Sequence, residues 1–161
     1  MTKEIALHRD EGKSIWMLGG LLTFKATGAE TDGRFSLIEV QNAPGGGSPP
    51  HIHHGEDEFF YILEGEVEVT IGDQKILGKP GSFVFAPRDI PHQFTAVGSQ
   101  NARLLIGLTP AGLEKFFQEI GEPAPSLTIP PQVAPTMEQM VAVANLAKQY
   151  SAEILLPTPA A

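Results

Sequence analysis

Between residues 14 and 109, short apolar runs alternate with turns that contain glycine or proline. The chain has 17 glycines and 14 prolines, so its direction changes often. Short runs at this spacing are typical of strands in an all-β sandwich or barrel. The predicted strands cover residues 14–17, 21–26, 35–40, 50–54, 58–63, 66–71, 74–77, 83–85, 91–95 and 102–108.

The turns between these runs support the same class of fold. Gly72-Asp73 suits a two-residue hairpin connection. Pro80-Gly81 suits the middle of a type II turn, because proline sets the first φ and glycine accepts a positive second φ. Residues 43–50 read Ala-Pro-Gly-Gly-Gly-Ser-Pro-Pro, which predicts a loop without regular structure.

Two helices are predicted after the last strand. Thr109-Pro110 would supply the cap and first-turn proline of one helix that ends at Gly121, and Thr136 would cap another that runs to about Tyr150. We expect a barrel over about residues 14–109 and a helical tail over about 110–161. Both belong to one domain, 1–161, because the tail is too short to hold a core of its own. The helices would pack outside the barrel or against a partner subunit.

Composition narrows the classes of partner. The 161 residues include 19 acidic and 11 basic side chains, a formal net charge of −8. Such a surface repels nucleic acid and anionic lipid, so neither is expected as a partner. There is no cysteine, which excludes disulfides and thiolate chemistry. The N-terminus has no signal-like apolar run and no stretch is long enough to span a membrane, which predicts a cytoplasmic protein.

Three of the five histidines lie together, at His51, His53 and His54. On a strand, the side chains of His51 and His53 project from one face, with Cα atoms about 6.5 Å apart. Two imidazoles at that separation can bind one metal ion at about 2.0–2.1 Å from each nitrogen. The ring of His54 would point the other way. A histidine pair alone is more often incidental than a metal site, so the pair needs further ligands.

An acid and a later histidine supply those ligands. Four residues separate His53 from Glu58, and they include a glycine that lets the strand break and change direction. Glu56 and Asp57 are competing acids, but only Glu58 continues the inward alternation of Phe60 and Ile62. The fourth predicted ligand is His92.

These residues resemble the two motifs of the cupin family. The first motif is matched at every position by Gly45-(five)-His51-Ile52-His53-(four)-Glu58-(six)-Gly65. The segment Gly81-(five)-Pro87-Arg88-Asp89-(two)-His92-(three)-Ala96 is similar to the second motif, with Asp89 in place of a glycine and Ala96 in place of an asparagine. The resemblance implies a double-stranded β-helix, or jelly-roll barrel, with one divalent metal ion held by His51, His53, Glu58 and His92.

A looser resemblance indicates an activity. Leu18-Gly19-Gly20, the segment 56–61 and Thr109-Pro110 resemble bacterial single-domain cupins that are quercetin dioxygenase-like. That likeness implies a metal-dependent dioxygenase acting on a small enediol, diketone or phenolic, flavonol-like substrate, with Glu58 as general base. Zinc prefers four ligands, whereas manganese, iron, cobalt and nickel accept six and would leave two positions open. The metal is therefore predicted only as Fe, Mn, Ni, Co or Zn.

The substrate pocket is predicted to be apolar. Six phenylalanines are candidates to line it, and simple core packing is the alternative for each: Phe24, Phe35, Phe60, Phe83, Phe85 and Phe94. Arg88 and Arg103 are candidates to orient an acidic substrate, against the alternative of ordinary surface charges. Tyr61 is expected to face away from the metal, between the sheets.

Other classes of function remain open at this point. A sugar-phosphate isomerase would need lysines or arginines that converge on the metal, and at most Arg88 is placed there. A metal-independent epimerase would use a histidine and a tyrosine, and the intact ligand set argues against it. A non-catalytic cupin that binds a metal or a small molecule would keep the fold without turnover. By resemblance, the expected partners are a small-molecule substrate and a second copy of the chain in a homodimer.

Overall fold

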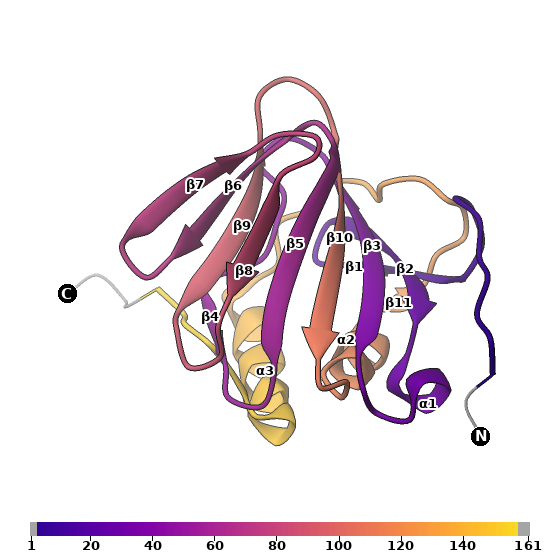
Figure 1. Ribbon diagram of the computed structural model, residues 1–161. Helices are drawn as coiled ribbons and strands as arrows, with labels where there is room; N and C mark the ends of the chain where they lie inside the picture. Colours follow the sequence, from indigo (N-terminus) through magenta and orange to yellow (C-terminus); the bar gives the residue numbers. More distant parts are fainter. Residues whose placement is uncertain (1–2, 158–161) are drawn as a thin grey trace.

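The computed structural model describes residues 3–157 and is built from two antiparallel sheets (Figure 1). In spatial order, the large sheet contains β11 (Glu122–Pro123), β1 (Lys13–Met17), β2 (Gly20–Ala26), β3 (Ser36–Asn42), β10 (Ala102–Thr109), β5 (Asp57–Glu64) and β8 (Phe83–Ala86). The small sheet contains β12 (Ala152–Ile154), β4 (His51–His53), β9 (His92–Val97), β6 (Glu66–Ile71) and β7 (Gln74–Gly78). The predicted all-β fold is confirmed.

The core lies between the two sheets because each strand alternates apolar and polar positions. In β5, the side chains of Glu58, Phe60 and Ile62 are buried, while Tyr61 between them is exposed. Val67 and Val69 of β6 face the same core from the small sheet. This period of two is what places the face of β5 that carries Glu58 inside the molecule.

A strand is present at each of the ten predicted positions, with ends that differ by at most two residues. Three elements were not predicted. One is the short helix α1 (Gly28–Thr31), which begins with a capping box formed by Thr27 and Glu30. The others are two very short strands of the tail. β11 pairs with β1 at the edge of the large sheet, and β12 pairs with β4 at the edge of the small sheet.

The two predicted helices are present as α2 (Glu114–Ile120) and α3 (Met137–Ala147), and α3 continues into the 3-10 turn η1 (Lys148–Tyr150). Thr136 caps α3 by accepting a hydrogen bond from the backbone N–H of Gln139 at 3.2 Å. The predicted cap of the first helix is wrong. Thr109 ends β10, and α2 begins only after Leu113, because the chain bends at Pro110 and Ala111 between them.

Both helices lie at one end of the sheets and close the core there (Figure 1). Leu113 and Phe116 contribute buried side chains from the segment of α2, and Ala147 contributes one from α3. They therefore belong to the main core rather than lying on an outer face. Among the described helices, none has the length and hydropathy that crossing a bilayer requires.

Candidate metal centre

Four side chains that could bind a metal ion meet between the sheets: His51, His53, Glu58 and His92. One ligand atom from each lies within 4.8 Å of all the others. Three of the four residues are buried, and His51 is partly buried. The three imidazole rings pack around one point, with centroids 4.3–5.0 Å apart. This brings together the four residues that the sequence predicted.

The two sheets share the positioning of these side chains. His51 and His53 project from the same face of β4, and His51 lies opposite His92 of β9 in the small sheet. Glu58 comes from the large sheet, near the start of β5, with Leu108 of β10 on one side and Ala86 of β8 on the other. Closing the two sheets on each other therefore brings the carboxylate to the three imidazoles.

The imidazoles are oriented by the backbone so that their Nε2 atoms face Glu58. The distances from Glu58 Oε2 to the Nε2 atoms of His92, His51 and His53 are 2.6, 3.6 and 3.7 Å. The Nδ1 atoms of His51 and His92 lie 2.7 and 2.9 Å from the carbonyl oxygens of Pro49 and Ile90, to which they donate. A proton held at Nδ1 leaves Nε2 available as a ligand.

The charges within the group are strongly coupled. Burial acts to raise the pKa of Glu58, but His53, His51 and His92 outweigh it and hold that pKa well below its usual value. Burial lowers the pKa of His53 to about 4. Burial also acts to lower the pKa of His92, but its hydrogen bond to Glu58 prevails and raises that pKa. These shifts favour the protonated form of His92 and the ionised form of Glu58.

The two competing acids lie outside the group. Asp57 faces the surface, where its carboxylate accepts hydrogen bonds from the side chain and backbone N–H of Arg88 at 2.9 and 3.0 Å. Glu56 is buried, but its Oε2 has no hydrogen-bond partner among residues 3–157. Burial and the nearby Glu114 raise the pKa of Glu56 to about 7. Of the three acids, the one that the alternation argument selected, Glu58, lies in the group.

An apolar cleft adjoins the four-residue group. It encloses about 750 Å³ of space, including the part that is open to solvent. His51, His53 and Glu58 lie on its wall, and apolar side chains from both sheets form most of the rest. The tail closes one side with Leu113, Phe116, Phe117, Ala147, Ala152 and Ile154. Within the described chain, no lysine or arginine lines this cleft.

The predicted pocket phenylalanines need correction. Phe94 lines the cleft, whereas Phe24 and Phe60 are buried in the core away from it. Phe35, Phe83 and Phe85 are 41 %, 61 % and 48 % exposed on the outer face of the large sheet. The pairing of β5 with β8 explains two of the errors, because Phe83 and Phe85 lie opposite Tyr61 and Phe59, on the face away from Glu58.

The aromatic side chains that do line the cleft from the tail are Phe116 and Phe117 of α2. Their helical spacing was visible in the sequence, but it did not indicate which surface the helix would cover. Tyr61 faces away from the metal-ligand group, as predicted, but it is exposed on the outer face rather than enclosed between the sheets.

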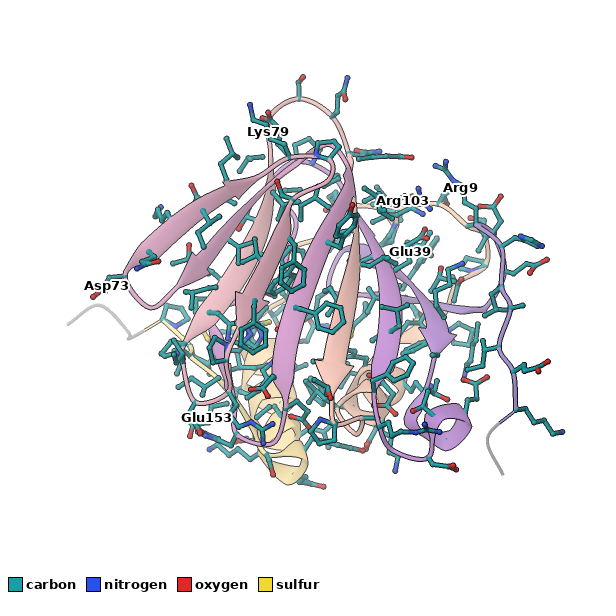
Figure 2. The ribbon with its side chains drawn as sticks, viewed as in Figure 1. Arg9, Glu39, Asp73, Lys79, Arg103 and Glu153 are labelled. Atoms are coloured by element: carbon teal, nitrogen blue, oxygen red, sulfur yellow. The ribbon has the colours of Figure 1, made fainter. Side chains whose placement is uncertain are left out.

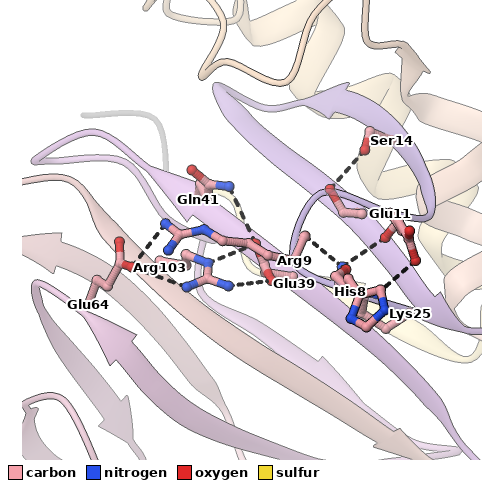
Figure 3. A network of polar contacts seen from close by, with 10 residues as sticks. His8, Arg9, Glu11, Ser14, Lys25, Glu39, Gln41, Glu64 and Arg103 are labelled. Atoms are coloured by element: carbon pink, nitrogen blue, oxygen red, sulfur yellow. Dashed lines mark hydrogen bonds and ion pairs between the residues drawn. The ribbon is translucent and has the colours of Figure 1, made fainter. Parts of the chain in front are cut away.

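Neither predicted arginine reaches the cleft. Arg88 forms an exposed ion pair with Asp57. Arg103 lies on the outer face of the large sheet, in the polar network of Figure 3. Figure 2 labels three residues of this network, Arg9, Glu39 and Arg103. The guanidinium of Arg103 donates to Glu39 at 2.8 and 3.0 Å and to Glu64 at 3.1 Å. Arg88 is an exposed charge and Arg103 is largely covered by its partners, and neither lies where it could orient a substrate in the cleft.

Comparisons with known proteins agree with this fold and site. Quercetin 2,3-dioxygenase of Bacillus subtilis is 28% identical over 117 residues, which cover 73% of this chain but only 34% of that protein. The chain thus spans about a third of that relative's length. Polyketide synthase CurC of Streptomyces cyaneus is 28% identical over 138 residues, which cover 86% of each chain.

A solved structure and a family match complete the comparison. The polyketide cyclase RemF from Streptomyces resistomycificus superposes with a TM-score of 0.58 and 27% identity, over 68% of this chain and 80% of that one. Residues 38–107, which include all four predicted ligands, match the cupin domain. The two sheets, the four-residue group and this match lead to one conclusion: the chain contains a cupin domain and has the cupin fold.

Proposed function

We propose that this cupin is a metal-dependent dioxygenase that acts on a neutral, enolisable substrate of the diketone or phenolic, flavonol-like class. One observation carries the proposal: three imidazoles and the carboxylate of Glu58 converge beside an apolar cleft, and His51, His53 and Glu58 line its wall. The match to a quercetin 2,3-dioxygenase supports the choice of reaction.

The donor set fits a divalent transition metal. Two of the imidazoles have Nδ1 tied to backbone carbonyls, so their Nε2 atoms are free to bind, and the carboxylate of Glu58 stays ionised. Three imidazoles with one carboxylate suit Fe, Mn, Co, Ni or Zn better than Mg or Ca. An ion bound there would act as a Lewis acid toward a substrate oxygen.

The residues of the chain then have distinct tasks. Glu58 takes the proton from the enol or phenol of the substrate, because its carboxylate is ionised and lies on the cleft wall. The deprotonated substrate is electron-rich and reacts with O₂. The apolar walls keep water away from it during that reaction.

The cleft also selects against charged substrates. Apart from the proposed metal ion, a sugar phosphate or a carboxylic acid would find no cationic partner, since no lysine or arginine of residues 3–157 lines the walls. Desolvating an unpaired anion is unfavourable by several kcal/mol or more. A sugar-phosphate isomerase is therefore not supported by this arrangement.

A second candidate function is cyclisation of a polyketide-type substrate without O₂. It is favoured by the match to CurC, which covers 86% of both chains, and by the likeness to the cyclase RemF. The chemistry would start in the same way, with Glu58 removing a proton from an enolisable position. The carbanion would then attack a carbonyl of the same molecule rather than O₂.

The test uses purified protein that has been freed of metal and reloaded separately with Fe²⁺, Mn²⁺, Co²⁺, Ni²⁺ or Zn²⁺. Quercetin and acetylacetone are supplied in air, and oxygen uptake is followed with an electrode. We expect uptake with at least one metal, and its loss in Glu58→Gln. The matched control is His8→Ala, which changes the only histidine outside the 51–54 cluster and His92.

The results of this experiment distinguish oxygenation, cyclisation and a non-catalytic role. Consumption of a phenolic or polyketide-type substrate under argon, at the same rate as in air, would favour cyclisation over oxygenation. Binding of substrate without any turnover under all five metals would indicate a non-catalytic cupin. Metal content that does not change in His53→Ala would remove the metal-dependent proposal altogether.

A further inference from the structure

A buried amide lies in the apolar cleft, at the end of β3. The inward residues of this strand are Ile38, Val40 and Asn42, and all three line the cleft. The side chain of Asn42 is only 2 % exposed. Alternation in a strand places Asn42 on the same face as two large aliphatic side chains, where a third apolar residue would be the usual occupant.

This amide lacks a partner. Its Oδ1 is buried and accepts no hydrogen bond from any residue in the described range 3–157. Its Nδ2 packs against the backbone of two glycines, since a Cβ added to Gly20 or Gly46 would lie 2.9 or 3.1 Å from it. A buried polar group left unpaired costs about 1–3 kcal/mol. Leucine, of nearly the same size, would avoid that cost.

The position of Asn42 in the sheet separates it from the metal-ligand group. Along β10, Ala102 lies opposite Asn42 and Leu108 lies opposite Glu58. Ala102 and Leu108 are six residues apart on one strand, so Asn42 and Glu58 are separated by about 20 Å along the strand direction. Leu22, Ile38, Val40 and Ile106 line the cleft between them. The cleft therefore has a polar group at each end and an apolar middle.

We infer that Asn42 is a specificity-determining residue whose Oδ1 accepts a hydrogen bond from a hydroxyl group at the far end of the substrate. The inference rests on the proposed function, because it takes the enolisable end of that substrate to lie at Glu58 and the three histidines. It narrows the substrate class to elongated, multi-ring phenolic compounds with polar groups at both ends. A small diketone would leave the amide of Asn42 unpaired.

The experiment compares two probes that share the enol and the carbonyl but differ in the hydroxyl groups on the outer rings. Quercetin carries hydroxyl groups on all its rings, whereas 3-hydroxyflavone keeps only the enol next to the carbonyl. Dissociation constants are measured by calorimetry under argon, on metal-loaded wild type, on Asn42→Leu and on Asn145→Leu. The last variant makes the same chemical change on the exposed side of α3. Asn42→Ala replaces Asn42→Leu if leucine does not fit beside the two glycines.

We expect the loss of the amide to weaken quercetin binding about tenfold, the effect of one hydrogen bond of about 1.4 kcal/mol. Binding of 3-hydroxyflavone should change less than about twofold, and Asn145→Leu should bind both probes as the wild type does. An equal change for both probes, or none for either, would overturn the role of Asn42 while leaving the proposed function intact. If the metal-loaded wild type binds neither probe, the proposed function is overturned, and this role with it.

Discussion

The two strands that carry most of the metal-ligand group differ sharply in how they are held. β5, which carries Glu58, is eight residues long and is paired with β10 on one side and with β8 on the other. β4, which carries His51 and His53, has three residues and meets β9 at the single pair His51–His92. Its other neighbour is β12, which pairs with it at all three positions.

The short strand is therefore held largely by the tail. The backbone N–H of Leu155 donates to Pro50 O, and that of His54 donates to Ser151 O, both at 2.8 Å. The ring of His54 adds contacts to Glu153 and to Asp89. The carboxylate is thus fixed by the large sheet, while the two paired histidines depend on residues nearly a hundred positions later. The predictions below test this difference.

The largest effect is expected from the ligands themselves. Glu58→Gln removes the only negative charge among three imidazoles, and His53→Ala removes one donor nitrogen. Each should lower metal affinity by at least ~100-fold, more than the 10–100-fold typical of outer partners. Competition with a chromophoric chelator measures the affinity. His8→Ala is the control, and retention of full affinity in either ligand variant would mean that the ion binds elsewhere.

The tail should matter nearly as much for metal binding. A chain ended after Tyr150 lacks β12, so β4 keeps only its single pair with β9. We expect metal affinity to fall about 10–100-fold, since the change removes support rather than a ligand. Leu155→Pro removes only the N–H that donates to Pro50 and should weaken binding in the same direction.

A chain ended after Pro157 keeps β12 and serves as the matched control for that truncation. Circular dichroism should show that the sheets persist in all these variants. If the chain that ends after Tyr150 is folded and binds metal as tightly as the control, then β4 is held by the core alone and the proposed difference between the two strands disappears.

The link between β4 and β5 is expected to affect stability rather than metal affinity. Glu56 lies there, and its pKa of about 7 in the folded state exceeds its ordinary 4.5. The folded protein then keeps a proton that the unfolded chain releases. This contribution to stability is complete below about pH 4.5 and is lost as the pH rises through 7.

Glu56→Gln removes that dependence. At pH 8, the metal-free variant should have a free energy of unfolding about 2 kcal/mol above that of the wild type, while the two should be nearly equal at pH 4.5. Urea titrations at both values of pH measure the difference. Glu138→Gln, on the exposed surface of α3, should change stability by less than about 0.5 kcal/mol at either pH. A destabilised Glu56→Gln at pH 8 would contradict this account.

The smallest effect is expected for His54→Ala. The ring of His54 is 42 % exposed and bridges Asp89 and Glu153, which ties β12 to the turn before His92. Exposed ion pairs contribute about 0–1 kcal/mol, so metal affinity should fall less than about fivefold. Glu153→Gln should have a similar small effect. A loss as large as that of His53→Ala would instead make His54 a ligand.

The sequence predicted the strands and the ligand set well because both depend on local patterns. Period-two alternation identified Glu58 rather than Glu56 or Asp57, and the spacing of His51 and His53 on a strand holds in the structure. The turn glycines Gly72 and Gly81 have the positive φ values, 55° and 91°, that such turns need. These features are set within a few residues of the chain.

What failed depends on pairing between distant segments. Phe83 and Phe85 alternate with buried Val84, but only the register against β5 decides which face turns inward. The three residues of β12 have no strand signal of their own, and they are extended because β4 offers them an edge. The amide of Asn42 resembles an ordinary loop residue until the cleft around it is known.

The pairing of β4 with β12 has a consequence for synthesis. The ribosome synthesises β12 roughly a hundred residues after β4, since His54 and Glu153 are 99 positions apart. At about 5–20 residues per second, the ribosome takes roughly 5–20 s to cover that distance. During this interval both histidines of β4 are already available to ions without their final support. Tight binding of the proposed metal ion is therefore expected only after the tail has been translated.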